Sequence, residues 1–212
     1  MPDETDRVSD EPGSDAQSAL ESAARVLRAT TCPIRGVSAR EREVLAGRQV
    51  RDLFAWARES GRLIEPSTYL PQAARGGEEH RAWPSEQEGR VRKCTYPGRC
   101  GFTLLANPLA GGLPGLAAAL PLEYLERLLL SNEVFGDDIQ LDGVALEAGK
   151  PVILTSQPAI IGKPPSLEEI ESFMRQLWFR PLAGAELGGP GALGSIGTWT
   201  RWWHSTLIPA TS

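Results

Sequence analysis

Cysteine and histidine are scarce in this 212-residue chain, which has three cysteines and two histidines. Cys32, Cys94 and Cys100 show no CxxC spacing, and His80 and His204 lie far apart in the sequence. Structural zinc sites need closely spaced cysteine and histidine ligands, and disulfide frameworks use cysteines in even numbers. We therefore predict reduced thiols and no histidine-rich metal site. Magnesium, which binds carboxylates and phosphates, stays compatible with this composition.

The chain also lacks a long apolar run, a basic stripe and an apolar N-terminal segment. No uninterrupted apolar run reaches the roughly 20 residues of a membrane helix. Residues 1–15 are acidic and have no apolar core, which excludes a signal peptide and predicts a disordered tail. The formal net charge is −5, so counterion release does not favour nucleic-acid binding. We predict a cytoplasmic protein without nucleic-acid or membrane partners, and the sequence indicates no oligomeric state.

Two amphipathic helices are predicted in an N-terminal helical extension, residues 16–70. In the first, the helical spacing is carried by Leu20, Ala23, Ala24 and Leu27. Ser38 followed by Glu41 is a capping-box pattern that opens the second helix, and Gly61 is well placed to end it. Its apolar stripe consists of Ala46, Val50, Leu53, Phe54 and Ala57. The arginines of this helix are most simply a solvated face.

Hairpin-linked strands and helices are both predicted after residue 70, and we expect an α+β fold. A hairpin is expected over residues 76–96, with its turn at 84–89, and a short strand at 101–105. A helix is predicted over residues 116–130, followed by strands at 139–144 and 151–160. The apolar run 152–154 indicates a strand that is covered on both faces. Ser166 with Glu169 is another capping box, which opens a helix reaching Trp178.

Lys93 follows the hairpin's second strand, and the next helix carries Glu123 and Glu126. This order of parts is typical of the small lobe of a protein kinase, where a strand lysine and a helix glutamate position nucleotide phosphates. The alternative is a surface lysine near ordinary helix carboxylates. Glu126 shares a helix face with three leucines, so we expect Glu126 rather than Glu123 to face Lys93.

Two short motifs flank this segment. Gly76 and Gly77 tolerate torsions that let backbone amides approach phosphates, although a plain turn also explains two adjacent glycines. Asp137 and Asp138 follow the helix and allow either a magnesium site or an acidic turn, of which we expect the turn.

Four stretches together resemble the serine/threonine/tyrosine kinase domain of bacterial polyvalent proteins, which are associated with phages and conjugative elements. They are Gly77-Glu78 before a strand, residues 90–98, residues 121–138, and residues 154–158 with Gly162. The resemblance covers residues 75–179 and implies a kinase-like domain over residues 71–180. That domain would comprise a small lobe of antiparallel sheet plus helix and the start of a helical lobe. The resemblance also implies that ATP and Mg²⁺ bind between the two lobes.

The resemblance also assigns roles by position. Lys93 would bind phosphate, with Glu126 as its helix partner and Glu123 as the fallback, and Gly76 and Gly77 would approach the phosphates. Residues 155–158, including Gln157, would connect the lobes and meet adenine through backbone groups.

The chain departs from this resemblance after residue 180. No aspartate and asparagine of an HRD-like catalytic loop and no DFG-like aspartate follow the connector, and residues 181–212 are rich in glycine and tryptophan. We therefore expect a truncated or altered kinase-like domain that is weakly active or inactive alone, with catalytic residues unassigned. The alternative is a non-catalytic interaction or regulatory module of a mobile genetic element, with a protein partner. A toxin or antitoxin component is a third interpretation.

Overall fold

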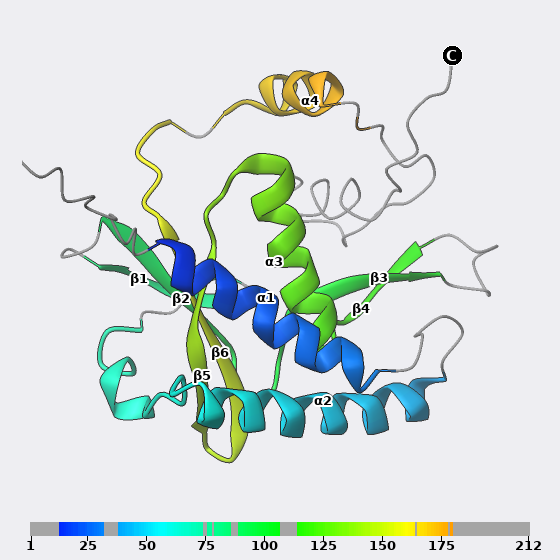
Figure 1. The fold of residues 1–212 in the computed structure, drawn as a ribbon. Helices are drawn as coiled ribbons and strands as arrows, with labels where there is room; N and C mark the ends of the chain where they lie inside the picture. Colours follow the sequence, from blue (N-terminus) through cyan, green and yellow to red (C-terminus); the bar gives the residue numbers. More distant parts are fainter. Residues whose placement is uncertain are drawn as a thin grey trace, which may run out of the picture. The chain divides into compact units, whose positions relative to one another are not determined.

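The structure is a computed structural model that describes residues 13–31, 38–73, 76–77, 79–85, 89–106, 114–163, 165–177 and 179. Several predictions concern residues outside these ranges, namely the acidic tail up to residue 12, the turn at 86–88 and the tail from residue 181. The described residues form helices, a four-stranded antiparallel sheet and a separate hairpin, which confirms the α+β class (Figure 1). They divide into two compact units.

The first unit contains the four-stranded sheet, whose strand order is β1-β2-β6-β5. Its strands are β1 (His80–Ser85), β2 (Arg90–Thr95), β5 (Gln140–Glu147) and β6 (Lys150–Pro158). The predicted hairpin is confirmed, because β1 and β2 pair antiparallel from His80↔Thr95 to Ser85↔Arg90. β6 lies between β2 and β5 and pairs with both, so it is a central strand, as its apolar run predicted.

Three helices belong to the same unit: α1 (Gly13–Ala29), α2 (Ala39–Glu59) and α3 (Pro121–Phe135). α1 contacts α2, α3 and β5, and Figure 1 shows it crossing between the other two helices. The four predicted apolar residues of α1 are buried. α1 begins at Gly13, so the prediction of a disordered tail up to residue 15 was wrong for its last three residues. The predicted capping box of Ser38 and Glu41 is present at the start of α2.

Two hydrophobic clusters lie on opposite faces of the sheet. One joins α1, α2 and α3 to β5 and β6 through residues such as Leu53, Leu125 and Ile153. The other packs Tyr69 and Trp83 against Val152 and Leu154, beneath the segment that contains the 3-10 helix η1 (Pro66–Thr68). The predicted N-terminal extension therefore shares one core with the sheet, because its apolar stripes pack directly on β5 and β6. The expected boundary at residue 71 does not separate two units.

A buried glutamine joins the three helices of this unit. Gln49 is fully buried; its amide donates to Thr31 Oγ1 at 3.0 Å, and its carbonyl accepts from the Leu122 N–H at 3.0 Å. The first N–H groups of a helix have no partner within that helix. Gln49 of α2 therefore supplies a hydrogen-bond acceptor for one of these N–H groups at the start of α3.

The start of α3 differs from the prediction. Residues 116–118 were expected to be helical but belong to β4 (Pro114–Ala118), which pairs antiparallel with β3 (Phe102–Ala106). The small and leucine side chains here suit a helix, but pairing with β3 supplies the backbone partners instead. β3 and β4 belong to the second unit, together with α4 (Leu167–Gln176), which has the predicted Ser166 capping box.

Candidate functional site

Lys93 lies in β2 on the sheet face that α3 covers, opposite Thr155 of β6. Its ammonium is part-buried and donates to the Gln157 side-chain oxygen at 2.8 Å. Burial lowers the pKa of Lys93, while the nearby carboxylates of Asp137 and Glu79 act to raise it. The structure thus brings together two of the predicted site residues, Lys93 and Gln157. Their contact is between side chains of neighbouring strands.

The two glutamates of α3 that were predicted as partners of Lys93 have other partners. The Glu123 carboxylate accepts hydrogen bonds from both terminal nitrogens of Arg42, at 2.9 Å each. It also caps its own helix by accepting a hydrogen bond from the Leu120 N–H at 2.8 Å. Glu126 pairs with Arg28 of α1 at 2.8 Å. The expected pairing of Lys93 with either glutamate is therefore not the arrangement in this structure.

The prediction that Glu126 is the more inward of the two glutamates was also wrong. Its side chain is 44% exposed, compared with 14% for Glu123. The reason is that α1 and α2 pack on α3 and present Arg28 and Arg42 to the carboxylates, which the spacing within α3 cannot reveal.

A buried histidine–tyrosine contact lies beside Lys93. His80 Nε2 is 2.8 Å from the Tyr124 hydroxyl, and Thr155 is hydrogen-bonded to the same hydroxyl. Burial lowers the pKa of His80 to about 4, so its ring is neutral at pH 7. Glu79 Oε2 lies 3.9 Å from His80 Nδ1, which favours the tautomer with the proton on Nδ1. In that tautomer the Tyr124 hydroxyl donates to Nε2.

An ion pair between Glu79 and Arg127 lies next to the His80–Tyr124 contact. Glu79, just before β1, accepts from both terminal nitrogens of Arg127 in α3, at 3.0 and 2.8 Å. Gly101 has φ +74°, and a Cβ there would lie 2.7 Å from Glu79 Oε1 and 2.8 Å from an Arg127 nitrogen. Gly101 therefore provides the space in which the ion pair forms.

The predicted phosphate-loop glycines have different surroundings. A Cβ on Gly76 would collide with the His80 carbonyl oxygen and lie 3.2 Å from the Arg81 Cα, so this glycine allows close backbone approach ahead of β1. Gly77 has open space where a side chain would be, and its carbonyl accepts from the Tyr96 hydroxyl at 3.1 Å. Gly76 therefore serves close backbone packing ahead of β1.

The structure corrects the prediction of a connector at residues 155–158. Residues 155–158 still pair with β2, from Lys93↔Thr155 to Arg90↔Pro158, so they are strand rather than linker. The chain leaves the sheet after Pro158, and the boundary between the two units falls at residues 159–160. Gln157 therefore enters the candidate site through its side chain.

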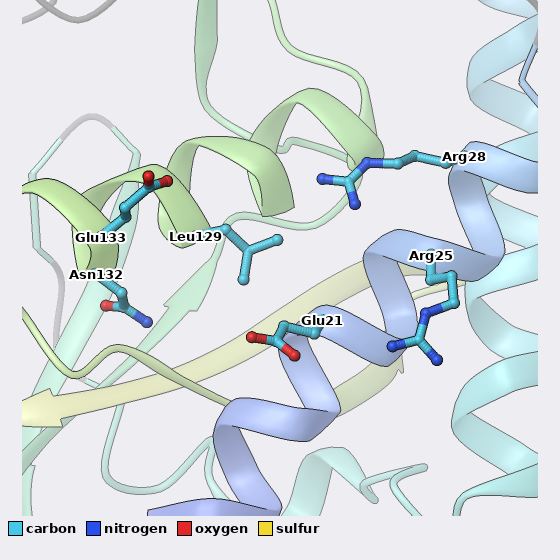
Figure 2. Close-up of a pocket in the computed structure, with 6 residues that line it drawn as sticks. All are labelled: Glu21, Arg25, Arg28, Leu129, Asn132 and Glu133. Carbon is cyan, nitrogen blue, oxygen red and sulfur yellow. The ribbon is translucent and has the colours of Figure 1, made fainter.

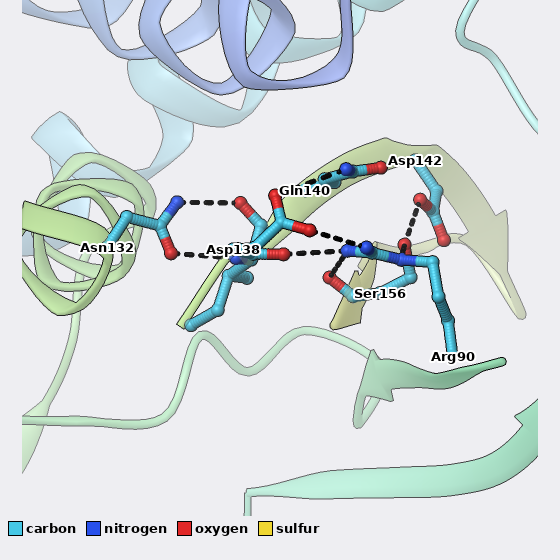
Figure 3. Close-up of polar contacts among 7 residues, drawn as sticks. Arg90, Asn132, Asp138, Gln140, Asp142 and Ser156 are labelled. Carbon is cyan, nitrogen blue, oxygen red and sulfur yellow. Dashed lines mark hydrogen bonds and ion pairs between the residues drawn. The ribbon is translucent and has the colours of Figure 1, made fainter. Parts of the chain in front are cut away.

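A second polar network lies at the start of β5 (Figure 3). Arg90 donates to the Asp138 carboxylate and to the Asp138 carbonyl, both at 2.6 Å, and also contacts Ser156. Asn132 bonds to both backbone groups of Ile139, at 2.7 and 2.8 Å. Asp138, with φ +46°, is thus the acidic turn residue that the sequence favoured over a magnesium ligand.

One surface pocket of about 570 Å³ lies elsewhere, between α1 and α3 (Figure 2). It is lined by Glu21, Arg25, Arg28, Leu129, Asn132 and Glu133. Lysine 93 and its partners are not among these residues. The pocket is lined by both acidic and basic side chains, so its charge does not indicate which class of ligand would bind there.

Metal binding and membrane crossing are considered for the described residues alone, as properties of their side chains and helices. Within them, no group of three or more His, Cys, Asp and Glu side chains is arranged to hold a metal ion. None of the helices described there combines the length and the apolar character required to cross a membrane.

In comparisons with known proteins, no family model, curated protein or solved structure matches the chain.

His80, Tyr124 and Arg127 were not predicted as site residues. For Tyr124 the sequence does carry a signal, because it lies one residue before Leu125 and four before Leu128 on the apolar side of α3. A buried tyrosine usually finds a hydrogen-bond partner. For His80 and Arg127 the partners lie 44 and 48 residues away in the sequence, and no local pattern indicates them.

Proposed function

We propose that this chain contains a protein-kinase-like nucleotide-binding domain in which Lys93 binds a phosphate of ATP. The observation that carries the proposal is the setting of Lys93. Its part-buried ammonium lies on an inner strand, and the hydrogen bond it makes is to a neutral amide, that of Gln157. A phosphate can replace an amide oxygen as acceptor and form a stronger, charge-assisted hydrogen bond.

The order of elements supports the same proposal. A glycine pair, a strand, the lysine strand, the β3–β4 hairpin, a helix and two further strands follow one another, and the last strand lies beside the lysine strand. Apart from the β3–β4 hairpin, this is the order that the resemblance to the kinase domain of polyvalent proteins implies.

In this proposal Lys93 would bind one phosphate group. The side-chain position of Gly77 is open space, so a phosphate would be able to approach the backbone of that glycine. Magnesium keeps several water ligands and commonly binds through phosphates with one or two carboxylates, so it does not require a group of three protein ligands. When bound, the ion would neutralise phosphate charge.

Thermal unfolding with and without magnesium-ATP tests this proposal. Ligand at a hundred times its dissociation constant should stabilise the protein by about 2.7 kcal/mol. We expect Lys93→Met to abolish this stabilisation, because methionine keeps the apolar stem but lacks the charge. Lys150→Met is the matched control, since Lys150 is exposed at the start of β6, and should leave the stabilisation unchanged. Equal stabilisation of the Lys93→Met variant would contradict the proposal.

A second candidate is the non-catalytic interaction module. It is favoured by exposed apolar side chains after β6, where Ile160 is 82% and Ile161 97% exposed. Exposed apolar groups that lie together mark protein-binding surfaces. This candidate requires a protein partner and no nucleotide. It predicts that replacing both isoleucines with serine abolishes partner binding without changing thermal stability.

A further inference from the structure

Four exposed arginines lie on one face of α2. With about 3.6 residues per turn, Arg40, Arg51 and Arg58 fall within about 20° of one another around the helix axis. Arg48 lies about 60° from Arg51 on the same basis. Among the described residues, none of these four guanidinium groups takes part in an ion pair. We call this face, formed by the four arginines, the basic ridge.

The opposite side of α2 is occupied by the protein itself. Leu53 and Trp56 are buried there in the hydrophobic core. Arg42 points to the same side, where Glu123 binds it at 2.9 Å and its side chain is 13% exposed. The basic ridge faces away from the core, and Val44, which lies on it, is 63% exposed. The ridge is therefore the part of α2 that an anionic group from elsewhere can bind.

The negative charge of the chain is concentrated in residues 1–12, which we call the acidic segment and which lie outside the described residues. It contains five carboxylates and one arginine, so it carries −4 of the formal net charge of −5, and the rest of the chain carries −1. The carboxylates belong to Asp3, Glu4, Asp6, Asp10 and Glu11. The acidic segment and the four arginines of the ridge are thus complementary in charge.

The path of α1 leads from the acidic segment to the C-terminal end of α2. Thr31, just after α1, accepts from Gln49 of α2, whereas Ser22, earlier in α1, accepts from Trp56 at 3.2 Å. Going back along α1 therefore leads toward the C-terminal end of α2, as Figure 1 shows. From Gly13 to Arg58 the path follows about 14 Å of α1 and crosses the width of α2, about 11 Å. Twelve extended residues reach about 40 Å, which is enough.

We propose that the acidic segment docks on the basic ridge, with the carboxylates farthest from α1, those of Asp3, Glu4 and Asp6, against Arg58 and Arg51. Exposed ion pairs are individually weak. Covalent attachment, however, gives the segment an effective concentration on the order of millimolar at the ridge, so that several weak pairs suffice together. Another polyanion then reaches the ridge only by displacing the segment. This docking does not depend on nucleotide binding by Lys93.

Arginine footprinting with phenylglyoxal tests the docking, because the reagent modifies accessible guanidinium groups and peptide mass spectrometry reports each arginine separately. A variant of the whole chain neutralises the acidic segment by Asp3→Asn, Glu4→Gln, Asp6→Asn, Asp10→Asn and Glu11→Gln. At low salt we expect Arg51 and Arg58 to react about twofold or more slowly in the natural protein than in this variant. Arg99, which is exposed after β2, is the matched control and should react equally in both.

Salt provides a second comparison within the natural protein, which does not depend on how the variant folds. At about 1 M salt the Debye length is only about 3 Å, so exposed ion pairs are screened. We expect Arg51 and Arg58 of the natural protein then to react as fast as those of the variant, with Arg99 unchanged relative to low salt. Equal reactivity of the two ridge arginines at low and high salt would contradict the docking.

Three further results would overturn the docking. Equal reaction of Arg51 and Arg58 in the natural protein and the variant at low salt would show that the acidic segment does not cover the ridge. Protection that grows with protein concentration would assign the ridge to the acidic segment of a second copy. Protection by duplex DNA at the same DNA concentration in both proteins would identify the ridge as an uncovered nucleic-acid surface.

Discussion

Replacing Glu147 with alanine is expected to lower the free energy of unfolding by about 3 kcal/mol, because it leaves a buried guanidinium without its anion. Glu147 accepts from Arg81 at 3.2 and 2.6 Å and from the Tyr69 hydroxyl at 3.1 Å. The side chains of Arg81 and Glu147 are 12% and 19% exposed, so water cannot take over these contacts. Chemical denaturation of the purified variant measures the loss.

The control for Glu147 removes both charges. Arg81→Met with Glu147→Leu leaves no unpaired ion, so this double variant should recover most of the stability that Glu147→Ala loses. The guanidinium also lies about 6 Å from the Tyr69 and Tyr96 rings, and methionine keeps part of that packing. A double variant as unstable as Glu147→Ala would show that packing, rather than the unpaired charge, explains the loss.

The protein should lose roughly 3 kcal/mol of stability through His80 when the pH falls from 7 to 4. Burial lowers the pKa of His80 from 6.5 to about 4 in the folded chain, so the unfolded chain binds the proton first. Acidification through this window therefore favours unfolding, and stability rises with pH across it.

Comparing His80→Gln with the natural protein isolates this effect from that of the carboxylates. Glutamine can keep a hydrogen bond to Tyr124 but has no proton to bind in this range. Unfolding free energies measured from pH 4 to pH 7 should therefore rise less steeply for the variant. Parallel pH profiles for the two proteins would show that His80 does not titrate as its burial indicates.

Local patterns were sufficient to predict much of the fold. The capping boxes at Ser38 and Ser166 and the stripe of α1 depend on residues three or four apart, which one helical turn brings together. The β5–β6 hairpin follows from its turn and its apolar run. β4 was missed because its strand state depends on pairing with β3, as in Leu104↔Leu116, which outweighs the helical preference of its residues.

The candidate site was less predictable because its partners come from distant parts of the chain. The hairpin prediction placed Lys93 at the end of its second strand, but the inner position of that strand depends on its pairing with β6. The surroundings of Lys93 were not predicted, since Arg28 and Arg42 pair with Glu126 and Glu123 across 98 and 81 residues. Gln157 was expected in the site for its backbone, but the register of β2 with β6 brings in its side chain instead.

Labelling with an acyl-phosphate derivative of ATP tests the central claim, that Lys93 binds nucleotide phosphate, most directly. Such a reagent acylates the lysine that lies against the bound phosphates, and peptide mass spectrometry identifies the site among the three lysines of the chain. We expect labelling of Lys93 that excess magnesium-ATP prevents, with weak and uncompeted labelling of Lys150 and Lys163. Equal labelling of all three lysines, unaffected by ATP, would contradict the assignment of a nucleotide site to Lys93.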